Sequence, residues 1–249
     1  MKKLSVIVMA MLIMAAPALA DEMVSAKLGY QFLSISGDFV GCNGGSGTKV
    51  DMESDIDFDD ADNAIAEAAL HLGDHRLSVS YMPLESSGSG NNADFDFNGV
   101  RYLGPVKGDL SLDLYEVAYA YYLLNFDDLP ARVQIGLEGA IKYVDADVKV
   151  RDRYGIIGQE SAQGSMPYPT IGARSRVAIS DFVGAVARLG YSSFDDESLL
   201  DIEAQVEFSP LPLVGIYGGY RYLAIEMDDS DLKLDATFSG PFIGVLARF

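Results

Sequence analysis

The chain has 249 residues and a formal net charge of −19, from 37 acidic and 18 basic residues. This acidic balance argues against a nucleic-acid partner, because a phosphate backbone requires a basic protein face. The single cysteine, Cys42, excludes an intramolecular disulfide, and no Cys/His cluster has the spacing of a zinc site.

The first 20 residues have the pattern of a secretory signal peptide. Met1-Lys-Lys precede an apolar stretch from Leu4 to Ala16, and Pro17-Ala-Leu-Ala20 stands directly before two acidic residues. A transmembrane anchor, the alternative, requires about 20 apolar residues. We therefore expect residues 1–20 to be a cleaved signal peptide and residues 21–249 to form the exported protein. No later stretch is long and apolar enough for a spanning helix, which leaves a periplasmic globule or a membrane barrel.

Alternation of apolar and polar residues predicts ten strands. The first runs from Val24 to Phe32, where apolar and polar residues follow one another for about ten positions, as in membrane-spanning strands. The same period of two recurs over 64–72, 76–82, 110–123, 132–143, 171–179, 183–191, 200–208, 214–222 and 232–249.

The connections between these strands alternate between long and short. Long polar passages are expected at 37–62, 85–98, 152–166, 192–198 and 226–231, and short turns at 73–75, 125–130, 180–181 and 209–213. Residues 95–108 are expected to fold as a hairpin above the membrane. Long loops on one side and tight turns on the other are typical of up-and-down barrels, and an even strand number puts both termini on the side of the turns.

Two of the predicted strands change phase. Apolar residues occupy the even positions up to Leu114 and the odd positions from Tyr115 onwards. We interpret this slip as a β-bulge, because a shift of one residue exchanges the two faces of a strand. A second change at Val144 predicts a ribbon, polar on both sides, that rises out of the bilayer.

The chain ends in a strand that alternates to its last residue. Ile243, Val245, Ala247 and Phe249 form one apolar row. The chain thereby resembles bacterial outer-membrane β-barrel proteins, whose terminal strand typically ends in Phe and is read by the barrel-assembly machinery. The resemblance implies an all-β fold, a transmembrane antiparallel up-and-down β-barrel of about ten strands or eight, in the outer membrane and in contact with lipopolysaccharide. Its last strand should pair with the strand from Val24 to Phe32.

A soluble periplasmic β-sandwich is the alternative fold. Asp201, Glu203, Gln205 and Glu207 lie in a row on one face of a strand, which suits a polar lumen and not a buried core.

Charged residues of both signs are predicted to face the lumen and to meet across it. They admit two interpretations, an ion-pair network that holds the barrel and a narrow polar path for small solutes, and the small strand number favours the first. The set comprises Lys27, Glu67, Arg76, Glu116, Arg132, Glu138, Lys142, Arg174, Arg176, Arg188, Asp201, Glu203, Glu207, Arg221 and Arg248.

Ten strands are also typical of the omptin proteases, which use acidic residues and a His at the extracellular rim. Here His71 and His75 flank the short turn at 73–75, at the opposite end of the barrel. A Ser/His hydrolase meets the same objection, because a general base must lie within hydrogen-bond reach of its nucleophile. We therefore expect no enzyme and no cofactor, with an outer-membrane hydrolase as the last alternative.

An acidic run from Asp51 to Asp62 is the remaining candidate site. Asp55, Asp57 and Asp59 have the opening spacing of an EF-hand, but Asp60 replaces its Gly and Ala66 its Glu. A solvated loop is therefore expected, and bridging of lipopolysaccharide through divalent cations is the functional alternative. The predicted function is a structural or small-solute-permeation barrel, with surface binding through the acidic loops as the alternative.

Overall fold

The computed structural model describes residues 23–42, 47–126, 132–156, 158–180, 182–195, 197–211 and 213–249. The expected signal peptide, residues 1–20, lies outside them. None of the described residues belongs to a helix long and apolar enough to cross a membrane.

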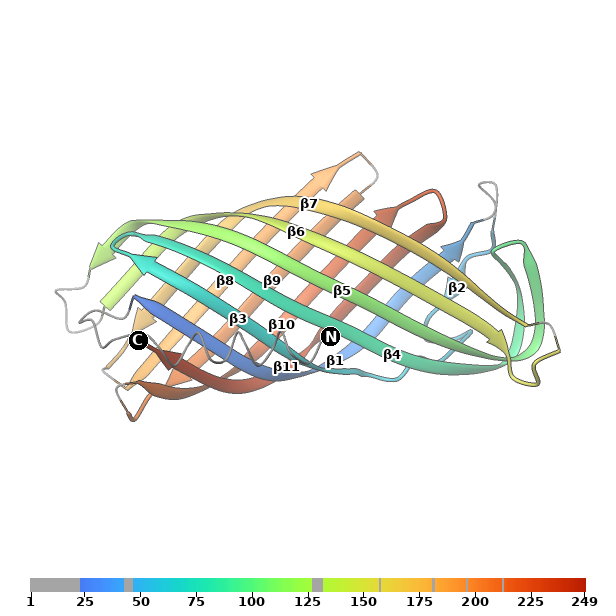
Figure 1. The fold of residues 1–249 in the computed structure, drawn as a ribbon, viewed down its shortest axis with the longest axis horizontal. Helices are drawn as coiled ribbons and strands as arrows, with labels where there is room; N and C mark the ends of the chain where they lie inside the picture. The colour runs from blue at the N-terminus through green and yellow to red at the C-terminus, as the bar shows by residue number, and fades with distance from the viewer. Residues whose placement is uncertain are drawn as a thin grey trace, which may run out of the picture.

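Ten long strands form a closed antiparallel ring (Figure 1), which confirms the predicted up-and-down barrel. Each strand pairs with the next one in the chain, and the last pairs with the first. A strand of two residues, β2 (Val50–Asp51), pairs with β1 beside the ring. The ring consists of β1 (Val24–Gly41), β3 (Ala61–Leu72), β4 (His75–Phe97), β5 (Val100–Phe126), β6 (Arg132–Asp152), β7 (Gln159–Ala178), β8 (Val183–Phe194), β9 (Glu197–Phe208), β10 (Val214–Asp228) and β11 (Leu232–Arg248).

The predicted closure between the last and the first strand is confirmed. Ala247 lies opposite Ala26, and this register continues along both strands. At the very end, the backbone N–H of Val24 donates to the carbonyl of Phe249 at 3.0 Å, and the N–H of Phe249 donates to Val24 at 2.8 Å. The last residue therefore takes part in closing the ring.

The barrel has two different ends. We call one end the turn end. It carries the short β3–β4 connection at Gly73-Asp74, together with Val24 and Phe249, at the start of the first strand and the end of the chain. The opposite end is called the loop end. β4 to β7 have 20 to 27 residues, whereas β8 and β9 have 12 each. Crossing a bilayer takes about 9–11 residues per strand. The long strands therefore exceed the span of a membrane, and Figure 1 shows β6 and β7 reaching beyond the β8–β9 hairpin at the loop end.

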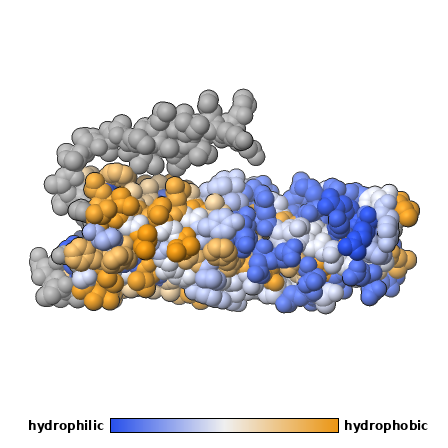
Figure 2. Space-filling model, turned by 90° about the horizontal axis from the view of Figure 1, so that it is seen from below, coloured by the Kyte–Doolittle hydropathy of each residue, from blue (hydrophilic) through white to orange (hydrophobic). Residues whose placement is uncertain are grey.

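Large apolar side chains form an exposed belt around the half of the barrel nearest the turn end (Figure 2). Its border toward the loop end is marked by Tyr81, Tyr115 and Tyr143, which lie opposite one another on β4, β5 and β6. The Tyr81 hydroxyl donates to the carboxylate of Asp113, one step beyond the belt, at 2.5 Å. We call the part of the barrel beyond this row the extension. Belt members include Leu28, Val117, Leu137, Ile141, Ile171, Val206, Ile216, Ile243 and Val245.

The phase change at Leu114 is not a bulge, contrary to the sequence interpretation. Leu114 pairs with Met82 and Tyr115 with Tyr81 in one unbroken register. The register shifts that involve β5 lie elsewhere, at Gly90/Ala93 on β4 and at Tyr122/Leu124 on β5 itself. The strand keeps its faces, and the surroundings change instead. In the belt the outside is apolar and the inside polar, whereas in the extension the inside is apolar and the outside polar.

The ribbon after Val144 follows the same rule, so it is not polar on both sides. Val144, Val148 and Val150 are completely buried inside the extension. They belong to one large apolar cluster, to which strands from all around the ring contribute. The cluster includes Leu33, Phe39, Val50, Met52, Ile56, Met82, Leu84, Phe97, Tyr102, Leu110, Leu112, Leu114, Leu223, Ile225, Leu234 and Phe238.

Segments predicted as loops complete this core. The passage 85–98 is a continuation of β4, which turns back at Asn98 and Gly99 with φ of 50° and 80°. Both residues need positive φ in such a two-residue turn, which suits Asn-Gly. The Asn98 N–H donates to the carbonyl of Gly41 on β1 at 3.1 Å. Beyond the short β8–β9 hairpin, β7 contacts β10 directly, because the Tyr168 hydroxyl donates to the backbone carbonyl of Glu226 at 2.8 Å.

Candidate functional site

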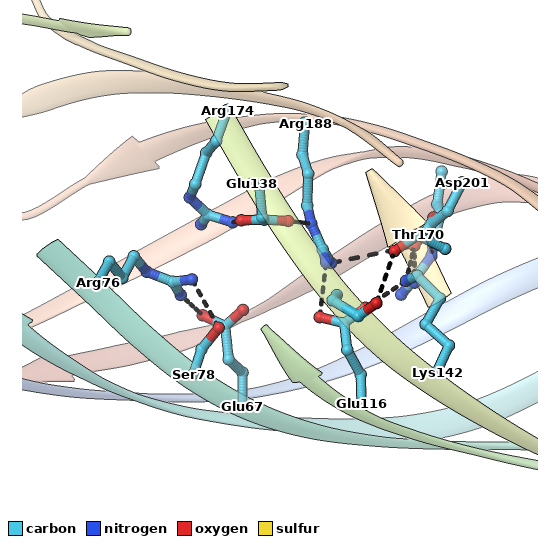
Figure 3. Close-up of polar contacts among 12 residues, drawn as sticks. Glu67, Arg76, Ser78, Glu116, Glu138, Lys142, Thr170, Arg174, Arg188 and Asp201 are labelled. Atoms are coloured by element: carbon cyan, nitrogen blue, oxygen red, sulfur yellow. Dashed lines mark hydrogen bonds and ion pairs between the residues drawn. The ribbon is translucent and has the colours of Figure 1, made fainter. Parts of the chain in front are cut away.

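Charged side chains of both signs converge inside the belt (Figure 3). They come from inward-facing positions of strands all around the ring, because alternation sends every second side chain into the lumen. Such groups are buried only when they are paired, and here they bind one another.

Lys142 on β6 is at the centre of this network. Its side chain is completely buried, and its Nζ donates to Glu116 Oε2 and, at 2.5 Å, to Asp201 Oδ2. Glu116 lies on the neighbouring β5, but Asp201 lies on β9, across the lumen. A single ammonium group thus ties two walls of the barrel together.

Three arginines complete the central network. The Arg188 guanidinium donates to Glu138 and, at 2.6 Å, to Glu116. Arg221 makes two parallel bonds to Asp201, at 2.9 and 2.7 Å, and Arg174 contacts Glu138 at 3.4 Å. Two-pronged guanidinium–carboxylate pairs fix orientation as well as distance.

A second group of ion pairs lies nearer the turn end. Arg76 donates to Glu67 at 2.7 Å and to the Ser78 hydroxyl at 2.8 Å. Lys27 lies 3.2 Å from Glu207 and also over the ring of Tyr217, at 5.2 Å from its centroid. Glu207 additionally accepts from Arg248 and, at 3.5 Å, from Arg176.

The structure thus brings thirteen of the predicted lumen residues into ion pairs. Glu203 faces the same region and acts electrostatically on Arg188 and Arg221. Arg132 differs from the prediction, because β6 begins at this residue and leaves it exposed at the mouth of the turn end. The thirteen are Lys27, Glu67, Arg76, Glu116, Glu138, Lys142, Arg174, Arg176, Arg188, Asp201, Glu207, Arg221 and Arg248.

Three polar residues of the lumen were absent from the predicted set. Gln205 donates to Glu207 at 2.9 Å, and Ser78 accepts from Arg76. Gln31 is completely buried, and neither its amide nitrogen nor its carbonyl oxygen has a hydrogen-bond partner. All three occupy inward positions of their strands. Alternation had placed Gln205 in the lumen-facing row with Asp201, and the same pattern could have placed Gln31 and Ser78.

Above the charged network, the apolar core of the extension occupies the same lumen. Phe39, Phe97 and Tyr102 are at most 1% exposed. A cavity of about 350 Å³ lies outside this core, between Glu53–Asp57 of the loop after β2 and Ser89–Asn92 of β4. The arrangement therefore fills the lumen with two successive layers, one charged and one apolar.

The two histidines lie at the turn end. His71 Nε2 is 3.1 Å from the hydroxyl of Ser25, and His75 Nδ1 is 2.6 Å from the hydroxyl of Tyr119. Within the described residues, no carboxylate is hydrogen-bonded to either imidazole. A Ser–His pair lacks the third group that orients the base in hydrolases.

The carboxylates of the acidic run are spread along the loop after β2. The Asp55 carboxylate accepts from the backbone N–H of Asp51 at 2.9 Å, and Asp57 has a positive φ of 44°. No group of three or more His, Cys, Asp or Glu side chains in the described part of the chain is placed to hold a metal ion. Asp55, Asp57 and Asp59 therefore do not converge on one point.

Comparison with known proteins relies on structure alone, because no protein-family model and no curated protein matches the sequence. The outer-membrane protease OmpT of Escherichia coli superposes with a TM-score of 0.60, at 10% identity, over 94% of this chain and 99% of that one. The chain has the fold of an outer-membrane β-barrel. Neisserial surface protein A superposes with a TM-score of 0.38, at 11% identity, over 92% of this chain and 98% of that one. Ail of Yersinia pestis superposes with a TM-score of 0.37, at 10% identity, over 91% of this chain and 99% of that one.

In an outer-membrane barrel the exposed belt faces lipid and the polar extension faces water. Ile243 and Val245 of the last strand are more than half exposed and contribute to the belt. Ala247 and Phe249 continue their row to the turn end. At an identity of 10% the likeness to OmpT concerns the fold and carries no catalytic residue over.

Proposed function

We propose that this protein is an integral outer-membrane β-barrel with a closed lumen, whose role is structural and not permeation. The observation that carries the proposal is the succession of two filled layers along the lumen. A solute would have to break the ion pairs around Lys142 and then cross the apolar core around Leu112, both of which are completely buried. We further propose that residues 1–20 are cleaved, that the barrel-assembly machinery inserts the protein, and that the loop end faces the outside.

Conductance across a planar bilayer tests this proposal. Purified protein should insert without producing discrete current steps, while flotation of proteoliposomes verifies that it is in the membrane. Steps that recur with a defined size in successful reconstitutions would refute the closed lumen.

A second function, surface binding, is favoured by the extension. Membrane crossing does not require β4 to β7 to be twice as long as a spanning strand. The extension has an apolar core of its own, so it is a rigid body held above the membrane and not a set of loose loops. A rigid body of this kind can present a surface to a partner.

Contact with lipopolysaccharide is part of this second proposal. Bridging of the acidic loop to lipopolysaccharide through divalent cations has less structural support. The acidic side chains of the loop after β2 do not converge on a metal position. Calorimetry with millimolar calcium and magnesium tests the bridge, and heat of binding that disappears in an Asp55→Asn, Asp57→Asn variant would support it.

We propose that the barrel is not an enzyme. Support comes from the position of both histidines at the turn end, away from the surface that faces the outside. Screening purified protein for peptide and ester hydrolysis tests this. A hydrolytic activity that is lost in a His71→Ala, His75→Ala variant would overturn it.

A further inference from the structure

Three large apolar side chains are exposed at the far tip of the extension. Leu103 is 59% exposed, Tyr154 72% and Ile156 83%. In the described part of the chain, the other exposed large apolar side chains belong to the belt or to its borders near the strand ends. Figure 2 shows the same contrast, with hydrophobic atoms reappearing at the end of an otherwise polar half. The tip therefore differs chemically from the rest of the extension.

The three residues are neighbours on two adjoining segments. The backbone N–H of Arg153 donates to the carbonyl of Pro105 at 3.0 Å, which holds the β6–β7 turn beside Leu103 on β5. Within the turn, the Asp152 carboxylate accepts from the Ile156 N–H at 2.7 Å, and the Gly155 N–H donates to the Asp152 carbonyl at 3.2 Å. The turn is thus fixed by its own hydrogen bonds and presents Tyr154 and Ile156 outward.

Basic residues surround this apolar tip. Arg101, Lys107, Arg151 and Arg153 lie on β5, on β6 and in the turn, whereas residues 51–62 contain seven acidic residues and no basic one. Arg101 pairs with Asp94 at 2.5 Å and with Asp96 at 3.5 Å, and Arg151 pairs with Asp109 at 3.2 Å. Arg153 donates to the Asn91 side chain at 3.2 Å, and Lys107 is exposed. Among the described residues, Lys107 and Arg153 are thus the two cations near the tip that are not paired with a carboxylate.

We propose that the tip binds a phospholipid bilayer outside the cell, opposite the outer surface from which the tip protrudes. Leu103, Tyr154 and Ile156 insert into that bilayer at the boundary between headgroups and acyl chains. Aliphatic and aromatic side chains flanked by Lys and Arg are the composition of surfaces that bind the membrane interface. Lys107 and Arg153 face the phosphate groups and give a preference for anionic lipid. The proposal depends on the outward orientation of the loop end proposed above.

A protein partner fits this surface less well. A stable protein–protein contact buries about 800 Å² on each side, with a packed apolar centre. Three side chains, two in the β6–β7 turn and one on β5, provide much less area. A fluid bilayer imposes no such requirement, because it closes around each inserted side chain and buries each one separately.

The experiment uses the whole mature protein in nanodiscs of phosphatidylcholine, so that its own belt is already covered by lipid. Binding to vesicles of phosphatidylcholine and of a phosphatidylcholine–phosphatidylglycerol mixture is followed by flotation. The test variant replaces Leu103, Tyr154 and Ile156 with Ser. The matched control is Phe194→Ser, which removes an apolar side chain that is 69% exposed at the end of β8.

We expect the nanodiscs to bind vesicles, the triple variant to bind at least about tenfold more weakly, and the control to bind normally. Lys107→Ser with Arg153→Ser should weaken binding to the mixed vesicles more than to pure phosphatidylcholine. Absence of binding by the unaltered protein, or equal binding by the triple variant, would overturn the proposal. Pairing of nanodiscs with each other without binding to vesicles would also overturn it, in favour of a second copy as the partner.

Labelling of an Ile156→Cys variant in intact cells with a membrane-impermeant thiol reagent separates the two proposals. Labelling without vesicle binding would leave the orientation intact and refute only the lipid contact. Absence of labelling would refute the outward orientation itself.

Discussion

Lys142 Nζ lies 2.5 Å from Asp201 Oδ2, although the two residues belong to β6 and β9, which are separated in the sheet by β7 and β8. The bond therefore crosses the lumen and does not follow the wall. Lys142 also donates to Glu116, so one cation serves two carboxylates that are both buried. Contacts of this kind hold strands that are not neighbours in the sheet at a fixed distance, which supports the proposed closed lumen.

Removing this cation should destabilise the barrel strongly. Lys142→Met leaves Glu116 and Asp201 without their shared partner, and breaking a buried pair in this way costs about 3–5 kcal/mol. Urea unfolding in detergent micelles, followed by far-UV circular dichroism, measures the effect. Lys149→Met is the control, because it removes a half-exposed pair with Asp147 on the outer face and should cost less than about 1 kcal/mol. Equal effects of the two substitutions would mean that the network does not hold the barrel.

A glycine in the first strand makes room for a tyrosine of the lumen. A Cβ on Gly29 would meet the Tyr217 hydroxyl oxygen at 2.5 Å, whereas a Cβ on Gly139 meets nothing within 4 Å. Gly29→Val should therefore lower stability by about 1–3 kcal/mol through overpacking, and Gly139→Ala should not. The fraction of folded barrel in heated and unheated gel samples measures both. Gly29→Val at wild-type stability would show that Tyr217 can move aside.

Deletion of Phe249 should reduce the amount of assembled barrel and leave export across the inner membrane unchanged. The deletion removes both hydrogen bonds to Val24 and the end of the apolar row that the assembly machinery is expected to read. Quantification of folded protein in outer-membrane fractions checks the first effect, and precursor processing checks the second. Deletion without loss of assembled barrel would remove this role from Phe249.

Acid should stabilise the extension locally at Asp235. This residue lies opposite Asp38 on β1 and Glu226 on β10, and burial together with these two carboxylates raises the pKa of its own carboxyl group. The folded state therefore holds this proton more tightly than the unfolded state, so stability rises as the pH falls through the raised pKa. Asp235→Asn should unfold at higher temperature than wild type at pH 7, and the difference should shrink toward pH 4. A difference that grows on acidification would contradict this sign.

The strands and their closure could be predicted from the sequence because a period of two is a local property. Val24 and Phe249 were correctly expected at the seam, since the even strand number and the terminal row both require it. The interpretation of the phase change at Leu114 and Tyr115 as a β-bulge was wrong. Alternation shows which residues share a face of a strand, but it does not show whether that face meets lipid, water or a core. The change in fact locates the point at which the strand leaves the membrane.

The charged network could be predicted only as a set of inward-facing residues. Which side chains meet depends on the tilt and stagger of the strands, so the Lys142–Asp201 bond could not be derived from spacing. Arg132 was misplaced because alternation does not show where a strand begins. The core of the extension was missed although Val148 and Val150 alternate clearly, since the expected membrane surroundings led to the opposite interpretation.

The central claim is that β5 changes its surroundings at Tyr115 without changing its faces, and cysteine labelling along this strand tests it most directly. Single cysteines are placed at outward positions 109, 111, 113, 117, 119 and 121 and at inward position 112, and a membrane-impermeant thiol reagent is applied to intact cells. The native Cys42 is buried, so the unaltered protein sets the background. The structure predicts labelling at 109, 111 and 113 and none at 112, 117, 119 or 121. Labelling at 112 together with protection at 111 would contradict it, because the two faces would then be exchanged as a bulge requires.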